Sequence, residues 1–303
     1  MMIVGIDENG LGPLLGPLIV TAAAFKAKTY DKDTFWKLAG PDLPADDSKV
    51  LFSAKHPAKS ESAFLSWLNI FGAKTLSQAD LLNEIGVKPY APLPCKTPAQ
   101  ICEPSQAPLP AWSNKKPQEL SLAIWNRFDR LGIKAHTIKA HQACPGLLNQ
   151  ELAKEGMNKF RFDFELMIDL VKKLGAKQNG DLLALCGKIG STRRYGPWLK
   201  AIDCQITDIV EETAKCSTYK IDGVGTLSFI RDGDGEHLPI AVASMVGKYL
   251  RELAMDQINA HLGRDRKNSV SGYRDRRTAL FVEETTPERK KMSLTNTCFL
   301  RNS

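Results

Sequence analysis

The segment "IVGIDENGLGPLLGP", residues 3–17, decides the interpretation of this chain. It places Asp7 and Glu8 directly after an apolar run, residues 3–6, and before a loop that holds three glycines and two prolines. The apolar run predicts a buried strand, and an unpaired carboxylate beside it is costly to desolvate. We therefore expect a compensating partner for these acids: either a metal ion or an ion pair at the end of the strand.

The composition is that of an ordinary globular protein. The 303 residues are 43% hydrophobic and 25% charged, enough for one large domain or two smaller ones. A net charge of +7 suits a polyanionic partner, although such a surplus also serves solubility alone. No apolar run approaches the ~20 residues of a membrane span, and the first residues lack a signal-peptide pattern. We expect a cytoplasmic protein without a membrane partner.

Metal chemistry based on sulfur or imidazole is not indicated. The seven cysteines include no C-x-x-C pair and the five histidines form no cluster, which favours reduced thiols and no zinc site.

The pattern of apolar residues predicts an α/β or α+β domain built on one sheet. The amino terminus is typical of a hairpin formed by residues 3–6 and 18–25. Further strands are expected over 134–141 and 181–187, and the segments 217–223 and 226–233 form one or two more. Helices are expected over 117–133, 146–156, 160–176, 198–214 and 239–262. Residues 89–117 hold eight prolines and no usable periodicity, which indicates an irregular insertion.

The predicted helix 239–262 has an apolar face at the i, i+3, i+4, i+7 spacing. Ser244, Lys248 and Arg251 fall on the opposite face. A hydroxyl group and two cations on an exposed face could bind consecutive phosphates, although an ordinary solvated face is the commoner explanation of such a stripe.

Acids precede this helix at Asp232, Asp234 and Glu236. If the helix packs across the first strand, one of them meets Asp7 and Glu8, and a cluster of carboxylates favours Mg²⁺ or Mn²⁺. In a regular strand Asp7 and Glu8 point to opposite faces, so one of them must reach the site through a distorted strand end or through its main-chain carbonyl.

Four segments together resemble ribonuclease HII. "GIDENGLGPLLGP" (5–17) is similar to the family's signature Asp-Glu-Ala-Gly-Arg-Gly-Pro with a second Gly-Pro, and "DDSKVL" (46–51) to its Asp-Ser-Lys-Lys-Leu element. "DGEHLPIAVASMVGKYLRE" (234–252) resembles the segment in which an Asp precedes an Ala-Ser-Ile/Ala-Lys/Arg helix, and "SGYRD" (271–275) resembles its Gly-Tyr element. Four weak motifs in the right order are far more specific than any one of them.

The resemblance implies a ribonuclease H-like fold with a mixed central sheet flanked by helices. One domain would comprise 1–88 and 118–280, with 89–117 as an insertion and 281–303 as a carboxyl-terminal tail. It implies cleavage of RNA in RNA·DNA hybrids, or at a ribonucleotide embedded in DNA, with Mg²⁺ or Mn²⁺. By motif position the metal-binding and catalytic acids are Asp7, Glu8 and Asp234, and the substrate contacts are Gly10, Leu11, Gly12, Lys49, Ser244, Lys248, Arg251 and Tyr273.

Two departures from the family pattern bear on activity. Gly187 stands where the family has its remaining acid, and Leu11 replaces the arginine of the glycine loop. Asp181, Asp203 or Asp222 would have to substitute for the acid, and Asp181 lies at the far end of its short strand, some 20 Å away at ~3.3 Å per residue. The sequence leaves two main hypotheses: an attenuated nuclease, or a pseudo-nuclease that binds hybrid or duplex nucleic acid without turnover. A protein-interaction role of the proline-rich segment has only composition in its favour.

Overall fold

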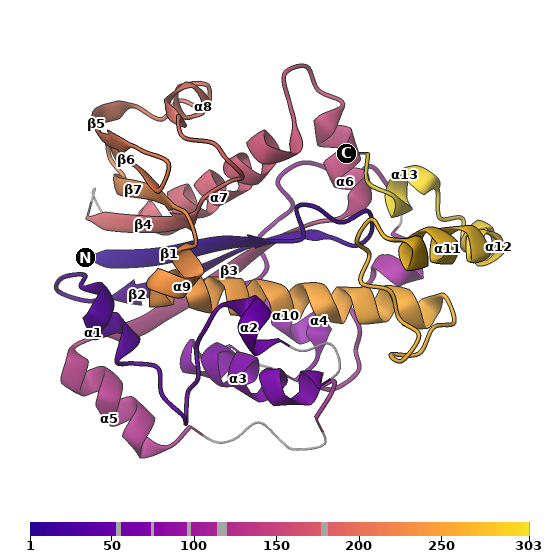
Figure 1. Cartoon of the computed structure of the whole chain (residues 1–303), viewed down its shortest axis with the longest axis horizontal. Coiled ribbons are helices and arrows are strands. Elements are labelled where there is room, and N and C mark those ends of the chain that lie inside the picture. Colours follow the sequence, from indigo (N-terminus) through magenta and orange to yellow (C-terminus); the bar gives the residue numbers. More distant parts are fainter. Residues whose placement is uncertain (53–55, 74–75, 96–97, 114–119, 177–180, 303) are drawn as a thin grey trace.

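The computed structural model is built on one mixed sheet of seven strands in the order β3-β2-β1-β4-β7-β6-β5 (Figure 1). It describes residues 1–52, 56–73, 76–95, 98–113, 120–176 and 181–302. The central strands β1, β4 and β7 are parallel, and every other neighbouring pair is antiparallel. The strands span Met2–Asn9 (β1), Leu18–Lys26 (β2), Lys134–Ala143 (β3), Leu182–Gly187 (β4), Ile206–Glu212 (β5), Cys216–Ile221 (β6) and Gly225–Ile230 (β7). The predicted α/β fold and its amino-terminal hairpin are confirmed.

The strand β1 is buried on both faces. Its side chains alternate between the two faces of the sheet, so they contribute to a hydrophobic core on each side. Val4 and Ile6 belong to one hydrophobic core and Ile3 to the other. Gly5 lies on the same face as Ile3, and a Cβ at this position would be 1.9 Å from the carbonyl carbon of Pro239. Only glycine therefore lets the long helix α10 begin directly on top of β1.

Helices cover both faces of the sheet (Figure 1). On one face, α10 (Leu238–His261) crosses β1 and β2, with α3 (Pro57–Ile70) packed below it. On the other face, α7 (Lys159–Gly175) packs against β1 to β4. The remaining helices are α1 (Lys32–Trp36), α2 (Ser48–Leu51), α4 (Gln78–Ile85), η1 (Gln100–Cys102), α5 (Leu122–Leu131), α6 (Pro145–Leu152), α8 (Gly196–Lys200), α9 (Gly233–Glu236), α11 (Arg276–Glu284), α12 (Thr286–Lys291) and α13 (Asn296–Phe299).

The prediction of a helix over 198–214 is wrong. A short helix, α8, ends at Lys200, and Ile206–Glu212 form the edge strand β5 paired with β6. The β-branched residues of "ITDIV" favour a strand, and pairing with β6 overrides the apparent helical spacing. Within the described ranges, no helix combines the length and the apolar character that a membrane span requires.

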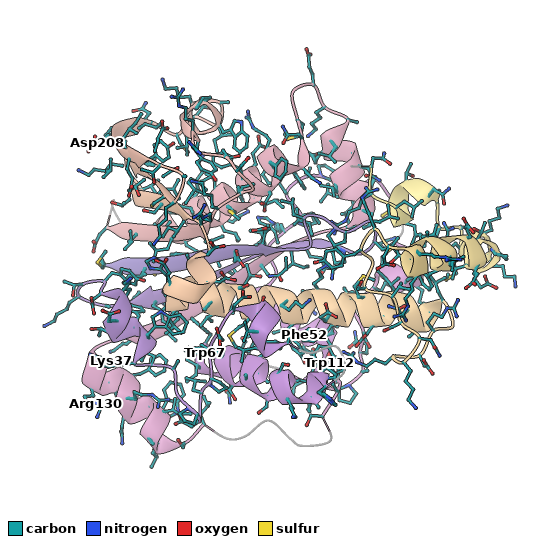
Figure 2. The ribbon with its side chains drawn as sticks, in the orientation of Figure 1. Lys37, Phe52, Trp67, Trp112, Arg130 and Asp208 are labelled. Carbon is teal, nitrogen blue, oxygen red and sulfur yellow. The ribbon has the colours of Figure 1, made fainter. Side chains whose placement is uncertain are left out.

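The proline-rich segment is mostly irregular but packs against the helical layer. The buried Glu61 carboxylate of α3 accepts hydrogen bonds from the backbone N–H groups of Ala111, Trp112 and Ser113, at 2.5, 2.8 and 2.8 Å. It also accepts one from the Tyr249 hydroxyl at 2.9 Å. Figure 2 shows Trp112 beside α3 and α10, in the same layer as Trp67. One buried carboxylate thus fixes part of the segment to the core.

Candidate active site

The carboxyl end of β1 carries the acids that the sequence singled out. Asp7 pairs with Thr21 of β2, and its side chain is only partly exposed. Burial raises the pKa of Asp7 well above its ordinary value, and the neighbouring carboxylates of Glu8 and Asp234 raise it further, whereas a hydrogen bond with the Ser244 side chain lowers it. Among the residues that the structure describes, no cationic side chain lowers this pKa.

Gly187, the last residue of β4, lies beside Asp7 because β1 and β4 are parallel and in register. A Cβ at Gly187 would be 2.3 Å from Asp7 Oδ1 and 3.8 Å from Glu8 Oε2. Both carboxyl groups therefore reach the space that a side chain at this position would need. The Glu8 side chain therefore approaches the same point as that of Asp7, although the two residues are adjacent in one strand.

The acids before α10 are distinguished by their partners. Glu236 pairs with Lys215, with 2.8 Å between Oε1 and Nζ. Asp232 is largely exposed and lies 3.5 Å from the Arg231 guanidinium. Asp234 is the one of the three that acts on the pKa of Asp7. Asp232 and Asp234 both line the cavity described below, and Asp234 remains the acid that the motif predicts.

These residues line one cavity of about 280 Å³. It combines segments that are far apart in the sequence: the ends of β1 and β4, the glycine loop after β1, Ser48, the α9 turn and Tyr273. Its lining comprises Asp7, Glu8, Asn9, Gly10, Leu11, Gly12, Ser48, Gly187, Lys188, Ile230, Asp232, Gly233, Asp234, Ser244 and Tyr273. Eight of the predicted site residues are in this set.

The glycine loop and Tyr273 form the accessible part of this cavity. Gly10 has a left-handed φ of +92°, and a Cβ there would be 2.6 Å from the Arg251 Nε atom. A Cβ at Gly12 would meet no atom within 4 Å, so the backbone there is open to a ligand. The Tyr273 side chain is 48% exposed. Loop backbone and aromatic ring can therefore both contact a large ligand.

The prediction of an exposed polar face on α10 is wrong. Ser244 and Arg251 are only 2% and 1% exposed, because α10 is covered by the sheet on one side and by further segments on the other. Arg251 donates a hydrogen bond to the Ser271 carbonyl, and its guanidinium lies 5.4 Å from the centre of the Tyr273 ring. Lys248 is paired with Glu252 at 2.8 Å. Arg251 thus supports the loop and Tyr273 from behind. The Lys49 side chain, also predicted to contact substrate, lies outside the described residues.

None of the three candidate replacements for the acid at Gly187 lines the cavity. Asp181 pairs with the amino terminus at 3.1 Å, at the opposite end of the strand. Asp203 has a left-handed φ of +57° in the connection after α8, and Asp222 lies in the turn between β6 and β7. The cavity lining includes no acid besides those already described.

Sequence reasoning missed a buried acid on α7. Asp163 is fully buried, and neither of its carboxyl oxygens has a hydrogen-bond partner among the described residues. Burial raises its pKa well above the ordinary value, and the nearby Asp7 carboxylate raises it further. A signal was present, because Asp163 shares its helix face with Met167 and Leu170, where an apolar residue is expected.

The donor set suits a hard divalent cation, since it consists of carboxylate oxygens. Among the residues that the structure describes, however, no three acidic, histidine or cysteine side chains form a ready-made metal site. Asp7 and Glu8 converge beside Gly187, and Asp234 faces the same cavity. The oxygen donors of these residues fit a divalent metal ion in their chemistry.

Comparisons with known proteins give likenesses in structure alone. No family model matches the chain, and no curated protein matches it in sequence. The ribonuclease HII from Archaeoglobus fulgidus, in its complex with PCNA, is similar with a TM-score of 0.43 and 16% identity, covering 99% of this chain and 94% of that one. Ribonuclease H2 from Pyrococcus horikoshii gives a TM-score of 0.48 at 14% identity, with 99% and 92% covered. Aquifex aeolicus ribonuclease H3 gives 0.48 at 12%, with 99% and 71% covered.

Proposed function

We propose that this protein is a divalent-metal-dependent endonuclease that cleaves RNA in RNA·DNA hybrids or at ribonucleotides embedded in DNA. The observation that carries the proposal is the cavity. Segments 5–17, 46–51, 234–252 and 271–275 resemble successive motifs of one nuclease family, and each contributes residues to the same cavity. Motifs that matched by chance would have no reason to meet in space.

The acids would hold Mg²⁺ or Mn²⁺. Asp7 and Glu8 are adjacent to each other beside Gly187, and Asp234 is close enough to raise the pKa of Asp7. A bound divalent cation supplies activation of a water molecule and stabilisation of the leaving oxygen in phosphodiester hydrolysis. The contribution of the chain is to bring these carboxylates to one cavity, and a bound cation would favour the ionised form of Asp7, whose pKa burial raises.

Substrate recognition would use the backbone of Gly10, Leu11 and Gly12 together with the Tyr273 ring. Glycine allows a main chain to approach a ribose closely, and a 2′-hydroxyl is the group that distinguishes RNA from DNA. The half-exposed Tyr273 ring, backed by the Arg251 guanidinium, offers a flat surface for the sugar. The net charge of +7 agrees with a nucleic-acid partner.

Attenuated turnover follows from Gly187. Fewer anionic ligands weaken the binding of a divalent cation, and Asp7 Oδ1 occupies the place where a side chain of residue 187 would begin. The same observation favours a second candidate function, a pseudo-nuclease that binds hybrid or duplex nucleic acid without cleaving it.

Cleavage of a labelled DNA duplex with one internal ribonucleotide tests both candidates. A long RNA·DNA hybrid and an all-DNA duplex of the same sequence are compared in Mg²⁺ and in Mn²⁺. The nuclease predicts cuts at the ribonucleotide, stronger in Mn²⁺ and abolished by Asp7→Asn. Binding of the hybrid without any cut in either metal would establish the pseudo-nuclease, and absence of binding would refute both.

A further inference from the structure

The carboxyl terminus of the chain contacts the glycine loop. Arg301 donates hydrogen bonds from Nε and Nη2 to the Gly16 carbonyl oxygen, at 2.8 and 2.5 Å, and from Nη1 to the Gly10 carbonyl oxygen. Its backbone N–H donates to the Leu14 carbonyl at 3.0 Å. One planar guanidinium therefore joins the two ends of the loop, which is the kind of multiple contact that arginine makes and lysine does not.

The segment that carries Arg301 is itself fixed. The Asn149 side chain of α6 donates to the carbonyl oxygens of Thr297 and Leu300, at 2.8 and 2.7 Å, and accepts from the Asn302 N–H at 2.7 Å. Arg301 is only 3% exposed. The tail thus brings a buried guanidinium to the loop from a rigid base.

The positive charge of Arg301 is unusual for a buried side chain. Among the described residues, no carboxylate lies within ion-pair distance of Arg301, and burial together with the Arg251 guanidinium lowers its pKa to about 9. The neighbouring Arg251 differs, because its Nη1 atom lies 3.6 Å from the Glu252 carboxylate, although its buried Nε atom has no hydrogen-bond partner in the described part of the chain. A buried cation without an acid partner is costly, so a role beyond stability is expected.

We propose that Arg301 is a positioning residue that holds the glycine loop in the shape needed to read a ribonucleotide strand, and that with Arg251 it makes this loop attractive to the phosphodiester backbone. This inference rests on the proposed function of the same cavity. The proposal also assigns a role to the carboxyl-terminal tail. The family signature has an arginine inside the loop, and Leu11 stands there, whereas Arg301 supplies a guanidinium to the same loop from the end of the chain.

The test compares Arg301→Lys with a matched control, Arg289→Lys. Arg289 is a buried arginine of the same tail, and it donates to Asn296, Val282 and Thr286, none of which belongs to the loop. Three readouts are used on the full chain without metal, and thermal denaturation gives the stability of each variant. Hydrogen–deuterium exchange reports on residues 9–17, and fluorescence anisotropy gives affinities for a DNA duplex with one ribonucleotide and for its all-DNA counterpart.

Arg301→Lys should speed exchange in residues 9–17 and weaken binding of the ribonucleotide duplex about tenfold, with a smaller loss on all-DNA duplex, because charge-assisted hydrogen bonds to the loop are lost. Arg289→Lys should lower thermal stability without either effect. A second variant, Asn149→Leu, releases the tail without altering Arg301 and should reproduce the faster loop exchange.

Equal loss of stability in the two lysine variants, with unchanged exchange in residues 9–17, would overturn the inference and leave a structural role for Arg301. A different failure is possible if loop exchange is faster in Arg301→Lys but the wild-type protein binds neither duplex. That result would refute the proposed function and the substrate role of Arg301, and Arg301 would then only stabilise the loop. The two failures are thereby distinguished.

Discussion

Substitution of Gly187 probes the point at which the acids converge. Three variants separate size from charge: Gly187→Ala adds a Cβ, Gly187→Asn adds the volume of an acid, and Gly187→Asp adds the acid itself. In each of them the new Cβ would lie 2.3 Å from Asp7 Oδ1 and 3.5 Å from Asp7 Cγ, so the Asp7 side chain must move.

The steric part of the effect should be similar in Gly187→Asn and Gly187→Asp, which add the same volume, and smaller in Gly187→Ala. Inserting atoms into a packed site costs about 1–3 kcal/mol, and a chain of this size loses about 2 °C of melting temperature for each kcal/mol. The added acid brings a further cost, because a third carboxylate near two others interacts unfavourably by ~4 kcal/mol per pair at 4 Å and an effective dielectric of 20, before relaxation or protonation. If relaxation and partial protonation reduce this cost to about 2 kcal/mol, Gly187→Asp should melt a further ~4 °C below Gly187→Asn in EDTA.

Bound metal should reverse the order of the melting temperatures of Gly187→Asp and Gly187→Asn. A divalent cation balances the added charge, so Mn²⁺ should stabilise Gly187→Asp more than the wild-type protein and should stabilise Gly187→Asn no more than the wild type. In the cleavage assay Gly187→Asp should raise the rate by orders of magnitude, with little change in affinity for the hybrid. Thermal denaturation in EDTA and in Mn²⁺, followed by single-turnover cleavage, measures both effects.

Two results would refute this reasoning. One is that Gly187→Asp and Gly187→Asn melt together in EDTA and respond equally to Mn²⁺. The other is strong Mg²⁺-dependent cleavage by the wild-type protein that Asp7→Asn abolishes and Gly187→Asp does not improve, since another ligand would then already fill the role of the missing acid.

Three further variants test other parts of the structure. Because the pKa of Asp163 is raised in the folded state, Asp163 stabilises the fold below the ordinary Asp pKa of ~3.9, and this stabilisation is lost as the pH rises through the raised value. The urea midpoint of the wild-type protein in EDTA should therefore decline between pH 5 and 8, and it should decline less in Asp163→Asn. An equal decline in both proteins would contradict this prediction. Tyr273→Ala should reduce the preference for a ribonucleotide duplex over all-DNA duplex, measured by anisotropy, whereas equal loss on both would exclude a contact with the sugar. Glu61→Gln should destabilise the fold by about 3 kcal/mol in urea, because a buried carboxylate that accepts four hydrogen bonds is lost; a loss under about 1 kcal/mol would show that it does not fix the proline-rich segment.

The sequence predicts those parts of the site that depend on local pattern. Asp7 and Glu8 end a strand whose apolar residues define it, and Asp234 precedes a helix with clear periodicity, so the location of each was predictable. Gly5 explains why the two segments meet, since it lets α10 lie on β1, but its role is visible only from the contact with Pro239.

Tertiary packing determines the features of the site and fold that local sequence pattern does not predict. Arg251 falls on a polar stripe, yet that side of α10 is buried, and its guanidinium supports the glycine loop. Residues 206–212 have apolar spacing compatible with a helix, but pairing with β6 makes them a strand. Arg301 acts on Gly10 from 291 positions away, a contact that no local pattern encodes.

Calorimetric titration of the full chain with Mn²⁺ tests the central claim most directly, namely that the carboxylates around Gly187 hold a divalent cation. We predict that the wild-type protein binds Mn²⁺, that Asp7→Asn abolishes binding and that Asp234→Asn weakens it. Asp181→Asn is the matched control, because the Asp181 side chain pairs with the amino terminus at the opposite end of β4 and does not line the cavity, and it should bind as the wild type does. Absence of binding to the wild-type protein, or wild-type binding by Asp7→Asn, would contradict the claim.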